Sequence, residues 1–332
     1  MRAKIFFVHT GNETFTEIDR ELLSTSFEVN NFHASRKFPA KFFNYWHGVR
    51  SSDAVFCWFA SWNSMWALWF AKLLHKPSIL VVGGYDIANL PEIGYGHQRG
   101  GLKKWISRWA VQMATIRITN SYYSRDEAEK NLELSKELVK VVYHGIADPF
   151  KKIFSEKDNL VLTVGNVDKP NLFRKGLEPF VRAAAFLPDT DFVLVGSWKD
   201  DAIDYLRSIA TPNVLFTGRI SDEELQGYFR RASVYVQVSQ HEGFGMSLAE
   251  AMLTGCIPVV TRAGALLEVV GDTGIYVDNC EAASVVKAIH LALDASEKWR
   301  ESVRQRIITL FPLEKREEVL AQIVISTLKA RK

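Results

Sequence analysis

Short apolar segments alternate with helical segments along the whole chain, and this alternation restricts the fold more than any other feature. In the first half the expected strands are Lys4–His9, Phe27–Phe32, Ala54–Phe59, Ser78–Val82, Ile116–Thr119 and Val139–Tyr143. In the second half they are Leu160–Val164, Phe192–Val195, Val214–Phe216, Val234–Val238, Pro258–Thr261 and Gly274–Val277. Because strands separated by helices build parallel sheets from βαβ units, the sequence predicts an α/β protein.

A chain of 332 residues has room for two domains, each with its own core. Between residues 143 and 152 a strand ends in Gly145, Asp148 and Pro149, and a charged segment follows. We therefore predict Rossmann-like domains over residues 1–150 and 151–311, facing each other across a cleft, and a final helix over residues 312–332. Ligands of open α/β sheets bind beyond the carboxyl ends of the strands, so this cleft is the expected site.

Composition favours a soluble globular protein, since 47% of the residues are hydrophobic and 24% are charged. The uncharged stretch Ala54–Ala71 approaches the length of a membrane-spanning helix. Ser61, Asn63 and Ser64 interrupt it, however, and divide it into a buried strand and an amphipathic helix over residues 63–75, capped by Asn63 or Ser64. We expect no membrane span here.

Cysteine usage and the start of the chain both favour the cytoplasm. The cysteines are Cys57, Cys256 and Cys280, which show neither disulfide nor zinc-ligand spacing. The chain opens on the strand Lys4–Val8 and continues into acidic residues, a pattern unlike a signal peptide. We expect a cytoplasmic protein, with contact to the inner face of the membrane as a further expectation.

The net positive charge lies in the first half of the chain, although chance scatter is the alternative. Residues 1–150 hold 18 lysines and arginines against 14 acids, and residues 151–332 hold 23 against 24. Within the first half, Arg36–Trp46 interleaves cations with aromatic rings, which suits contact with an anionic membrane surface. Stacking on sugar rings and ordinary packing are the alternatives. No nucleic-acid partner is expected, because there is no large basic field and no nucleic-acid motif.

The most informative stretch, residues 239–252, reads SQHEGFGMSLAEAM. A β-branched strand precedes it and a helix-forming run ends it, so Gly243 and Gly245 lie on a strand-to-helix turn. Such a turn directs free N–H groups and the positive end of the helix dipole at one point, which suits a phosphate or a sugar oxygen. Glu242 at the turn and Glu250 on the helix could accept hydrogen bonds from two separate diols. A tight turn with a surface glutamate is the structural alternative.

This stretch resembles the Glu-x7-Glu motif of group 1 (family 4) glycosyltransferases, which have the GT-B fold. Further segments match that family in order and spacing: VLFTGRISDEEL (214–225), LTVG (162–165), RKG (174–176) and GCIPVV (255–260). The resemblance is close over roughly residues 140–280 and loose in the first half. It implies a retaining, metal-independent transferase that uses a nucleotide sugar such as a UDP- or GDP-sugar as substrate, with no cofactor. It also implies that the last helix crosses back onto the first domain.

By the resemblance, Lys175 and Arg174 hold the donor's diphosphate and Glu242 is the third catalytic residue. Fixed cations suit this position because negative charge develops on the leaving group. The donor-binding residues implied are Glu250 for the ribose, Gly243, Phe244 and Gly245 for the sugar, Arg219 and Ile220 at the base, and Asn166. The family usually has arginine at the position of Asn166, so Arg174 or, as an alternative, Lys169 would supply the second positive charge.

In the first domain the resemblance is weaker. Relatives often place histidine at the position of Gly83, whereas Gly84 and Asp86 keep the family pattern. Asp86 could contact the acceptor or the donor, and a surface-loop role is the alternative. His9, which ends the first strand, and His97, in a glycine-rich loop, are two further candidates.

No metal site is expected. Asp189 and Asp191 form the Asp-x-Asp pattern of metal-dependent transferases, but they precede a strand and so lie at the edge opposite the expected cleft. We interpret them as a solvated turn.

The sequence therefore predicts transfer of a hexose-like sugar to a hydroxyl of a glycan or a lipid-linked acceptor. A nucleotide-sugar-binding subunit without catalysis, and a nucleotide-sugar epimerase or hydrolase on the same fold, are the alternatives. A dinucleotide-dependent dehydrogenase is disfavoured because no Gly-x-Gly-x-x-Gly follows the first strand. The donor sugar, base, acceptor, linkage and oligomeric state are not determined by the sequence.

Overall fold

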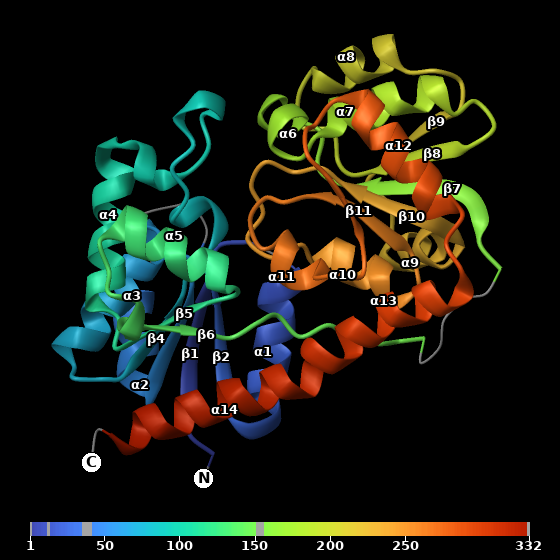
Figure 1. Ribbon diagram of the computed structural model, residues 1–332. Coiled ribbons are helices and arrows are strands. Elements are labelled where there is room, and N and C mark those ends of the chain that lie inside the picture. The colour runs from blue at the N-terminus through green and yellow to red at the C-terminus, as the bar shows by residue number, and fades with distance from the viewer. Residues whose placement is uncertain (1, 12–13, 35–41, 151–155, 331–332) are drawn as a thin grey trace. The chain divides into compact units, whose positions relative to one another are not determined.

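The computed structural model describes residues 2–11, 14–34, 42–150 and 156–330 (Figure 1). The chain divides into two compact units. The first unit comprises residues 1–145 together with 313–332, and the second comprises residues 146–312. Residues 36–41 of the segment Arg36–Trp46 lie outside the described residues, and its described part, from Phe42 onward, belongs to a helix.

The first unit is built on a six-stranded sheet in the order β2-β1-β3-β4-β5-β6, and every pair of neighbours is parallel. Its strands are β1 (Lys4–His9), β2 (Glu28–His33), β3 (Ala54–Trp58), β4 (Ser78–Val81), β5 (Ile116–Thr119) and β6 (Val139–Val141). The chain order reverses between β1 and β3, so the switch point of this sheet lies there. The central strands β1 and β3 are buried along almost their whole length, so both faces of the sheet are covered there.

Helices cover both faces of this sheet. They are α1 (Thr14–Ser26), α2 (Phe42–Ser51), α3 (Trp62–Leu73), α4 (Gly101–Met113), α5 (Tyr122–Leu132) and α14 (Leu313–Lys329). One apolar cluster joins the sheet to α2, α3, α4 and α5, and a second joins its other face to α1 and α14. Short 3-10 turns, η1 (Gly84–Asp86), η2 (Pro91–Ile93), η3 (His97–Arg99) and η4 (Lys136–Leu138), complete the unit.

The last helix, α14, is fastened to the first unit by a buried ion pair as well as by apolar contacts. Arg316 donates to both carboxylate oxygens of Asp19 on α1, at 2.5 and 2.7 Å. Its Nη1 group donates to the Val142 and Tyr143 carbonyls at 2.9 and 2.7 Å. Because both charges are almost completely buried and hydrogen-bonded to each other, the pair fixes α14 beside α1 (Figure 1).

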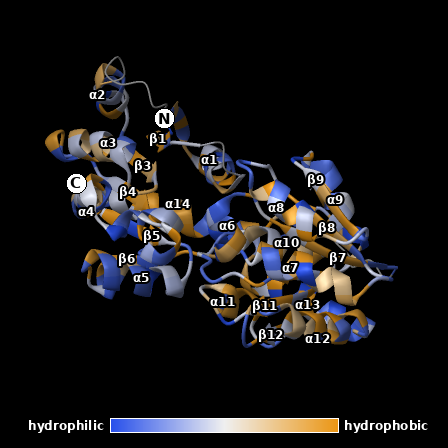
Figure 2. Ribbon diagram, turned by 90° about the horizontal axis from the view of Figure 1, so that it is seen from above, coloured by the Kyte–Doolittle hydropathy of each residue, from blue (hydrophilic) through white to orange (hydrophobic). Residues whose placement is uncertain are grey.

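The second unit contains another parallel six-stranded sheet, in the order β12-β11-β10-β7-β8-β9. Its strands are β7 (Asp158–Val164), β8 (Asp191–Val195), β9 (Val214–Gly218), β10 (Ala232–Gln237), β11 (Ile257–Thr261) and β12 (Ile275–Val277). Its helices are α6 (Lys169–Arg174), α7 (Leu177–Ala183), α8 (Ala202–Ile209), α9 (Asp222–Arg231), α10 (Met246–Leu253), α11 (Leu266–Val270), α12 (Ala282–Leu293) and α13 (Glu297–Leu310), with the 3-10 turn η5 (Ala184–Phe186). The switch point lies between β7 and β10, and Figure 2 shows the apolar character of inner strands such as β11.

The two parallel sheets confirm the expected α/β class with two Rossmann-like domains. The start of α3 differs from the expectation, because Ser61 and not Asn63 or Ser64 is its N-cap. Ser61 has extended dihedral angles and its N–H donates to the Ser64 hydroxyl at 2.9 Å, so Asn63 and Ser64 lie inside the first turn. Within the described part of the chain, no helix is both long enough and apolar enough to cross a bilayer.

Candidate functional site

Charged side chains of the second unit gather at the carboxyl edge of its sheet, at the switch point between β7 and β10. The segment after β7 carries Asn166, Arg174 and Lys175, and the loop after β10 carries Glu242. Since β7 and β10 are hydrogen-bonded neighbours, the two segments emerge side by side. This is the place where open α/β sheets bind ligands.

Lys175 and Glu242 form the centre of the cluster. The Lys175 ammonium lies 3.4 Å from Glu242 Oε2, and the two side chains are 21% and 16% exposed. The Gln237 amide, at the end of β10, donates to the same oxygen at 2.7 Å. Burial acts to raise the pKa of Glu242, but the positive charges of Lys175 and Arg174 outweigh it, so the pKa is lowered. Glu242 is therefore a carboxylate at neutral pH.

Arg174 is held next to this pair by an asparagine. Its Nε and Nη2 donate to Asn171 Oδ1 at 3.0 and 2.7 Å, and its Nη1 reaches the His241 carbonyl at 3.4 Å. The Asn171 amide in turn donates to the Asn166 carbonyl at 2.9 Å and to Asp168 at 3.0 Å. The guanidinium is thus oriented by the loop that follows β7.

Two glycines allow the close packing of this cluster. Gly264 has φ +62°, and a Cβ there would lie 2.3 Å from the Glu242 carbonyl oxygen. The next residue, Ala265, donates its N–H to that same oxygen at 2.9 Å, so the loop after β11 supports the backbone of Glu242. A Cβ on Gly165 would lie 3.0 Å from Lys175 Cδ, so the absence of a side chain there leaves room for the Lys175 stem.

The turn Gly243–Gly245 leads from Glu242 into α10. Gly245 adopts φ +99° as the N-cap of α10, a conformation that favours glycine. The Phe244 ring is buried and packs edge-on against Phe311, with ring centroids 5.3 Å apart. The Phe244 side chain therefore anchors the turn, which leaves its main chain as the part able to contact a ligand.

Glu250 lies on α10, one turn beyond its first residue. Its carboxylate forms no hydrogen bond or ion pair with any residue that the structure describes. Burial, with a smaller contribution from Asp222, raises the pKa of Glu250 to about 7. Tyr235 of β10 is completely buried near both glutamates, and burial together with their charges raises its pKa well above 10. A hydroxyl-bearing ligand could therefore engage the Glu250 carboxylate without displacing a partner among the described residues.

The remaining predicted residues of the second unit lie at the same edge of the sheet. Arg219 and Ile220 directly follow β9, and Arg219 is exposed. Asn166 is also exposed, and its carbonyl, not its side chain, is the group that holds Asn171. Lys169 pairs with Asp201 at 2.7 Å instead of joining the Lys175 cluster, so Arg174 is the second cation of that cluster.

The predicted residues of the first unit have a different character. Asp86 is almost completely buried, and its carboxylate accepts the Ala60 and Gly83 N–H groups at 2.8 and 3.0 Å. It is therefore not a surface-loop residue, and burial raises its pKa to about 7. Gly84, with φ +74°, begins the same 3-10 turn.

His9 is buried at the end of β1, and its Nδ1 lies 2.6 Å from the Gly11 carbonyl. This contact places the proton on Nδ1 and leaves Nε2 as an acceptor that has no hydrogen-bond partner in the described structure. The ring stacks on His33 with centroids 5.1 Å apart. His97 lies beside Tyr85, and burial lowers its pKa.

Sequence reasoning missed two residues that position the cluster, Gln237 and Asn171. Gln237 is an amide directly after the apolar run Val234–Val236 of β10, and a buried polar residue in that position is a usable signal. Asn171 lies three residues after the helix cap Asp168, to which it donates its backbone N–H at 2.8 Å. In the sequence it therefore looks like an ordinary residue of a capped first helical turn. Its link to Arg174 depends on the tertiary structure.

Asp191 is the first residue of β8 and thus lies at the amino edge of the sheet, away from Lys175 and Glu242. Among the described ranges, no group of three or more histidines, cysteines or acids is placed to bind a metal ion.

The resemblance to group 1 glycosyltransferases is confirmed by comparison with known proteins. Residues 146–308 match the family described as "Glycosyl transferases group 1". An uncharacterized 41.2 kDa protein of the cps region of Klebsiella pneumoniae is 29% identical over 60% of this chain and 61% of its own length. The Escherichia coli O-antigen chain mannosyltransferase B is 30% identical over 40% of this chain and 37% of its own length. The matches thus span less than two thirds of these curated relatives.

Solved structures confirm the GT-B fold over nearly the whole chain. The Anabaena protein HepE in complex with UDP and glucose has a TM-score of 0.75 at 18% identity, covering 98% of this chain and all of that one. Sucrose-phosphate synthase from Thermosynechococcus elongatus has a TM-score of 0.77 at 16% identity, covering 99% of this chain and all of that one. At these identities the comparison establishes the fold alone.

Proposed function

We propose that this chain, whose second unit matches the group 1 glycosyltransferases, is a retaining glycosyltransferase. It transfers a hexose-like sugar from a nucleoside-diphosphate sugar to an acceptor hydroxyl. The observation that carries the proposal is the pairing of Lys175 with Glu242 at 3.4 Å, with Arg174 held alongside, at the switch point of the second sheet. Two cations and one carboxylate leave a net positive charge there, which suits a diphosphate.

The donor would be held at three points. Lys175 and Arg174 bind the diphosphate, and the Glu250 carboxylate accepts hydrogen bonds from the ribose diol. Glu242, fixed by Gln237 and by the backbone of Ala265, binds sugar hydroxyls together with the amides that follow it. Positioned cations of this kind stabilise charge that develops on the leaving group more strongly than charge present in the bound donor.

The transfer step requires no base from the protein. The bond between the sugar's anomeric carbon and the diphosphate oxygen breaks, and a bond from that carbon to the acceptor oxygen forms on the same face. The acceptor's proton passes to the departing phosphate oxygen, so the products are the glycoside and the nucleoside diphosphate. Lys175 and Arg174 stabilise the negative charge that builds up on that phosphate, and no metal ion is needed.

The names of relatives guide the choice of substrates. Besides the E. coli O-antigen protein, the Rhizobium leguminosarum lipopolysaccharide core biosynthesis mannosyltransferase is 31% identical over 35% of this chain. We therefore propose a glycan or lipid-linked acceptor and a hexose such as mannose, with a GDP- or UDP-sugar as donor. Contact with an anionic membrane surface would bring the enzyme to such an acceptor.

Two departures from the family pattern favour a second candidate, a nucleotide-sugar-binding subunit without catalysis. The exposed Asn166 occupies the position where the family usually has an arginine, and Gly83 the position where relatives often have a histidine. Such a protein would bind the donor but never release the nucleoside diphosphate.

The test is a panel of nucleotide sugars scored by thermal shift, followed by an assay for release of nucleoside diphosphate in the presence of glycan acceptors. A donor at about 100 times its dissociation constant stabilises the protein by about 2.7 kcal/mol. Release that depends on the acceptor supports the transferase, and release without acceptor indicates a hydrolase. The configuration of the new linkage, determined by NMR, tests retention directly.

A further inference from the structure

Three adjacent helices of the first unit carry no acidic residue at all. They are α2, α3 and α4, of 10, 12 and 13 residues, which pack on the same face of the sheet and contact one another in sequence order. Their cations are Arg50, Lys72, Lys103, Lys104 and Arg108. Arg108 forms an ion pair with Glu133 at 3.0 Å, and Lys103 and Lys104 form none within the described residues.

The helices on the rest of the first unit differ sharply. On the opposite face of the sheet, α1 contains Glu17, Asp19 and Glu21, and α14 contains Glu314, Glu317 and Glu318. The helix α5, next to α4, contains Asp126, Glu127 and Glu129. The absence of acids is therefore a property of α2, α3 and α4 and not of the unit as a whole, and the exposed acid on the segment that leads into α4 is Glu92 of η2.

The same surface exposes large apolar side chains. On α4, Leu102 is 67% exposed and Trp105 is 62% exposed, and the Trp105 ring lies 5.4 Å from that of Trp109. Phe43 on α2 is 76% exposed and Trp62 on α3 is 43% exposed. By contrast, Phe42 and Trp46 pack against Phe70 inside the unit, so these two rings of the segment Arg36–Trp46 serve packing.

The exposed side chains share one end of the helical layer. Each of the three helices follows a parallel strand, so their first turns lie toward the carboxyl edge of the sheet. Phe43, Trp62 and Leu102 are the first or second residues of their helices, and Trp105 lies one turn further along α4. We call this set, with Lys103 and Lys104, the rim of the α2–α4 layer.

We propose that the rim of the α2–α4 layer docks the protein on an anionic lipid surface. The basic side chains meet negatively charged headgroups, and the tryptophan and leucine side chains enter the interface, as in amphipathic helices that lie in the plane of a bilayer. Tryptophan is favoured at this depth because its ring is apolar and its N–H is polar. A second copy of the chain fits less well, because a symmetric contact through this surface would place Lys103 and Lys104 against the same lysines.

This docking concerns the first unit and does not depend on the donor assignment in the second. It predicts that the protein floats with vesicles containing phosphatidylglycerol at low salt and is progressively released as salt rises. It should float poorly with vesicles of phosphatidylcholine alone. The doubly neutralised variant Lys103→Gln/Lys104→Gln should lower the partition coefficient about 30-fold at low salt.

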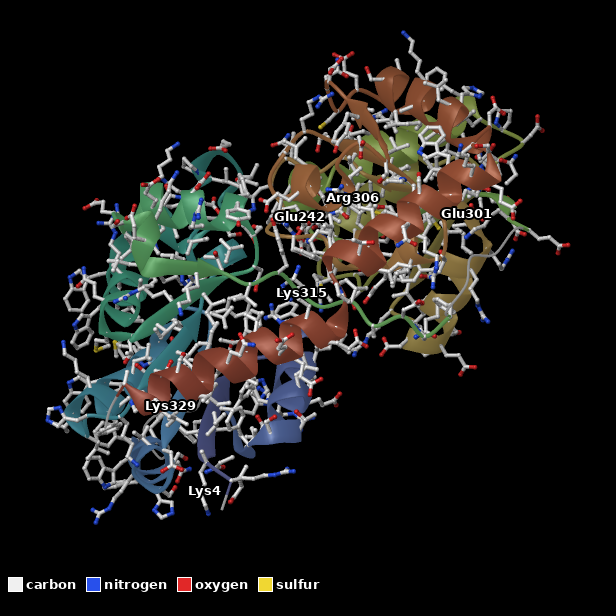
Figure 3. The ribbon with its side chains drawn as sticks, turned by 60° about the horizontal axis from the view of Figure 1, so that its bottom comes forward. Lys4, Glu242, Glu301, Arg306, Lys315 and Lys329 are labelled. Atoms are coloured by element: carbon white, nitrogen blue, oxygen red, sulfur yellow. The ribbon has the colours of Figure 1, made fainter. Side chains whose placement is uncertain are left out.

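The apolar contribution is tested by Leu102→Ser/Trp105→Ser. Both side chains are mostly exposed, so the fold should persist, and membrane binding should fall about tenfold or more at every salt concentration. Matched controls are Phe186→Ser/Leu291→Ser, which removes two equally exposed apolar groups of the second unit, and Lys315→Gln/Lys329→Gln on α14 (Figure 3). Both controls should bind vesicles like the wild type.

Binding of the nucleotide sugar chosen by the donor panel should be unchanged in all four variants, which verifies folding and separates the two proposals. Equal recovery with and without vesicles, or equal losses in rim and control variants, would overturn the docking proposal. Sedimentation that shows a concentration-dependent dimer abolished by Leu102→Ser/Trp105→Ser would also overturn it, since the surface would then be a protein interface.

Discussion

The two units contain the same kind of sheet but use its carboxyl edge differently. In the second unit, Lys175 and Glu242 are partly exposed and face each other beside Arg174, so their charges are available to a ligand. In the first unit, Asp86 is buried and both of its oxygens accept backbone N–H groups. A shared architecture supplies two comparable edges, and the local placement of charge is the reason why we propose diphosphate binding at the edge in the second unit.

In the first unit, charged residues instead join two helices or lie on the surface of the unit. Arg316 and Asp19 join the last helix to the first, and Lys103 and Lys104, which form no ion pair with a described residue, lie on the rim of the α2–α4 layer. Mutations in the two units should therefore have separable effects, on stability in the first and on ligand binding in the second.

The largest effect is expected from Asp19→Ala. It leaves the buried Arg316 guanidinium without its carboxylate, which should lower the free energy of unfolding of the first unit by about 3–5 kcal/mol. Urea unfolding followed by tryptophan fluorescence measures this, because seven of the nine tryptophans lie in that unit.

The matched control is Glu17→Ala on the same helix, whose ion pair with Arg20 is partly exposed. Its loss should cost about 1 kcal/mol or less. Equal destabilisation by both substitutions would show that the buried pair does not fasten α14.

Lys175→Ala should have the largest effect on catalysis. Because the Lys175 charge is needed most as the bond to phosphate breaks, kcat should fall about 10²–10³-fold, and donor binding should weaken less. Steady-state kinetics with the donor and acceptor selected by the panel measures both. Lys169→Ala is the control, since this exposed lysine pairs with Asp201, and it should stay within a few-fold of wild type.

Much of this contrast was already present in the sequence. The alternation of strands and helices predicted both sheets, since parallel strands buried on both faces are continuous apolar runs. The glycines and glutamates of residues 242–250 placed the candidate site, because the chemistry and the turn are adjacent in the chain. Gln237 and Gly264 could not be assigned in the same way, because their contacts with Glu242 come from tertiary packing.

In the first unit the sequence predicted that Asp86 lies near the end of a strand, but it did not predict that Asp86 is buried. The partners of its carboxylate are main-chain N–H groups, which any residue could supply, so no pattern of residue types reveals them. The basic, apolar rim of the α2–α4 layer was also not predicted, because its members are distributed over three helices. The local composition of the segment Arg36–Trp46 predicted a membrane contact there, although two of its rings are used in packing.

A smaller effect is expected from pH. The raised pKa of Glu250, about 7, means that the free protein holds a proton there below pH 7. This proton's stabilising effect on the fold is complete below the ordinary value of 4.5 and is lost as pH rises from there through 7. Binding of the ribose diol favours the carboxylate, so donor affinity should rise about tenfold between pH 6 and pH 8. A nucleotide sugar is the suitable probe, because its diphosphate bears no group that titrates in this range.

Glu250→Gln should remove this pH dependence, and the wild type should release protons on binding near pH 7. Calorimetry in buffers of different ionisation enthalpy detects the release. A wild-type affinity that is constant from pH 6 to pH 8 would place the diol elsewhere.

The smallest effect is expected from metal removal. If Lys175 and Arg174 neutralise the diphosphate, EDTA should leave turnover unchanged. Loss of activity that Mg²⁺ restores would contradict this and would favour a metal site at Asp189 and Asp191.

The central claim is that the second unit binds the nucleotide through Glu250, and calorimetric titration with the selected nucleoside diphosphate tests it most directly. Glu250→Ala should weaken binding by roughly 1.5–3 kcal/mol, the cost of losing charge-assisted hydrogen bonds. Glu301→Ala, at an exposed glutamate of α13 in the same unit (Figure 3), should bind like the wild type. Equal dissociation constants for the wild type and Glu250→Ala would contradict the claim.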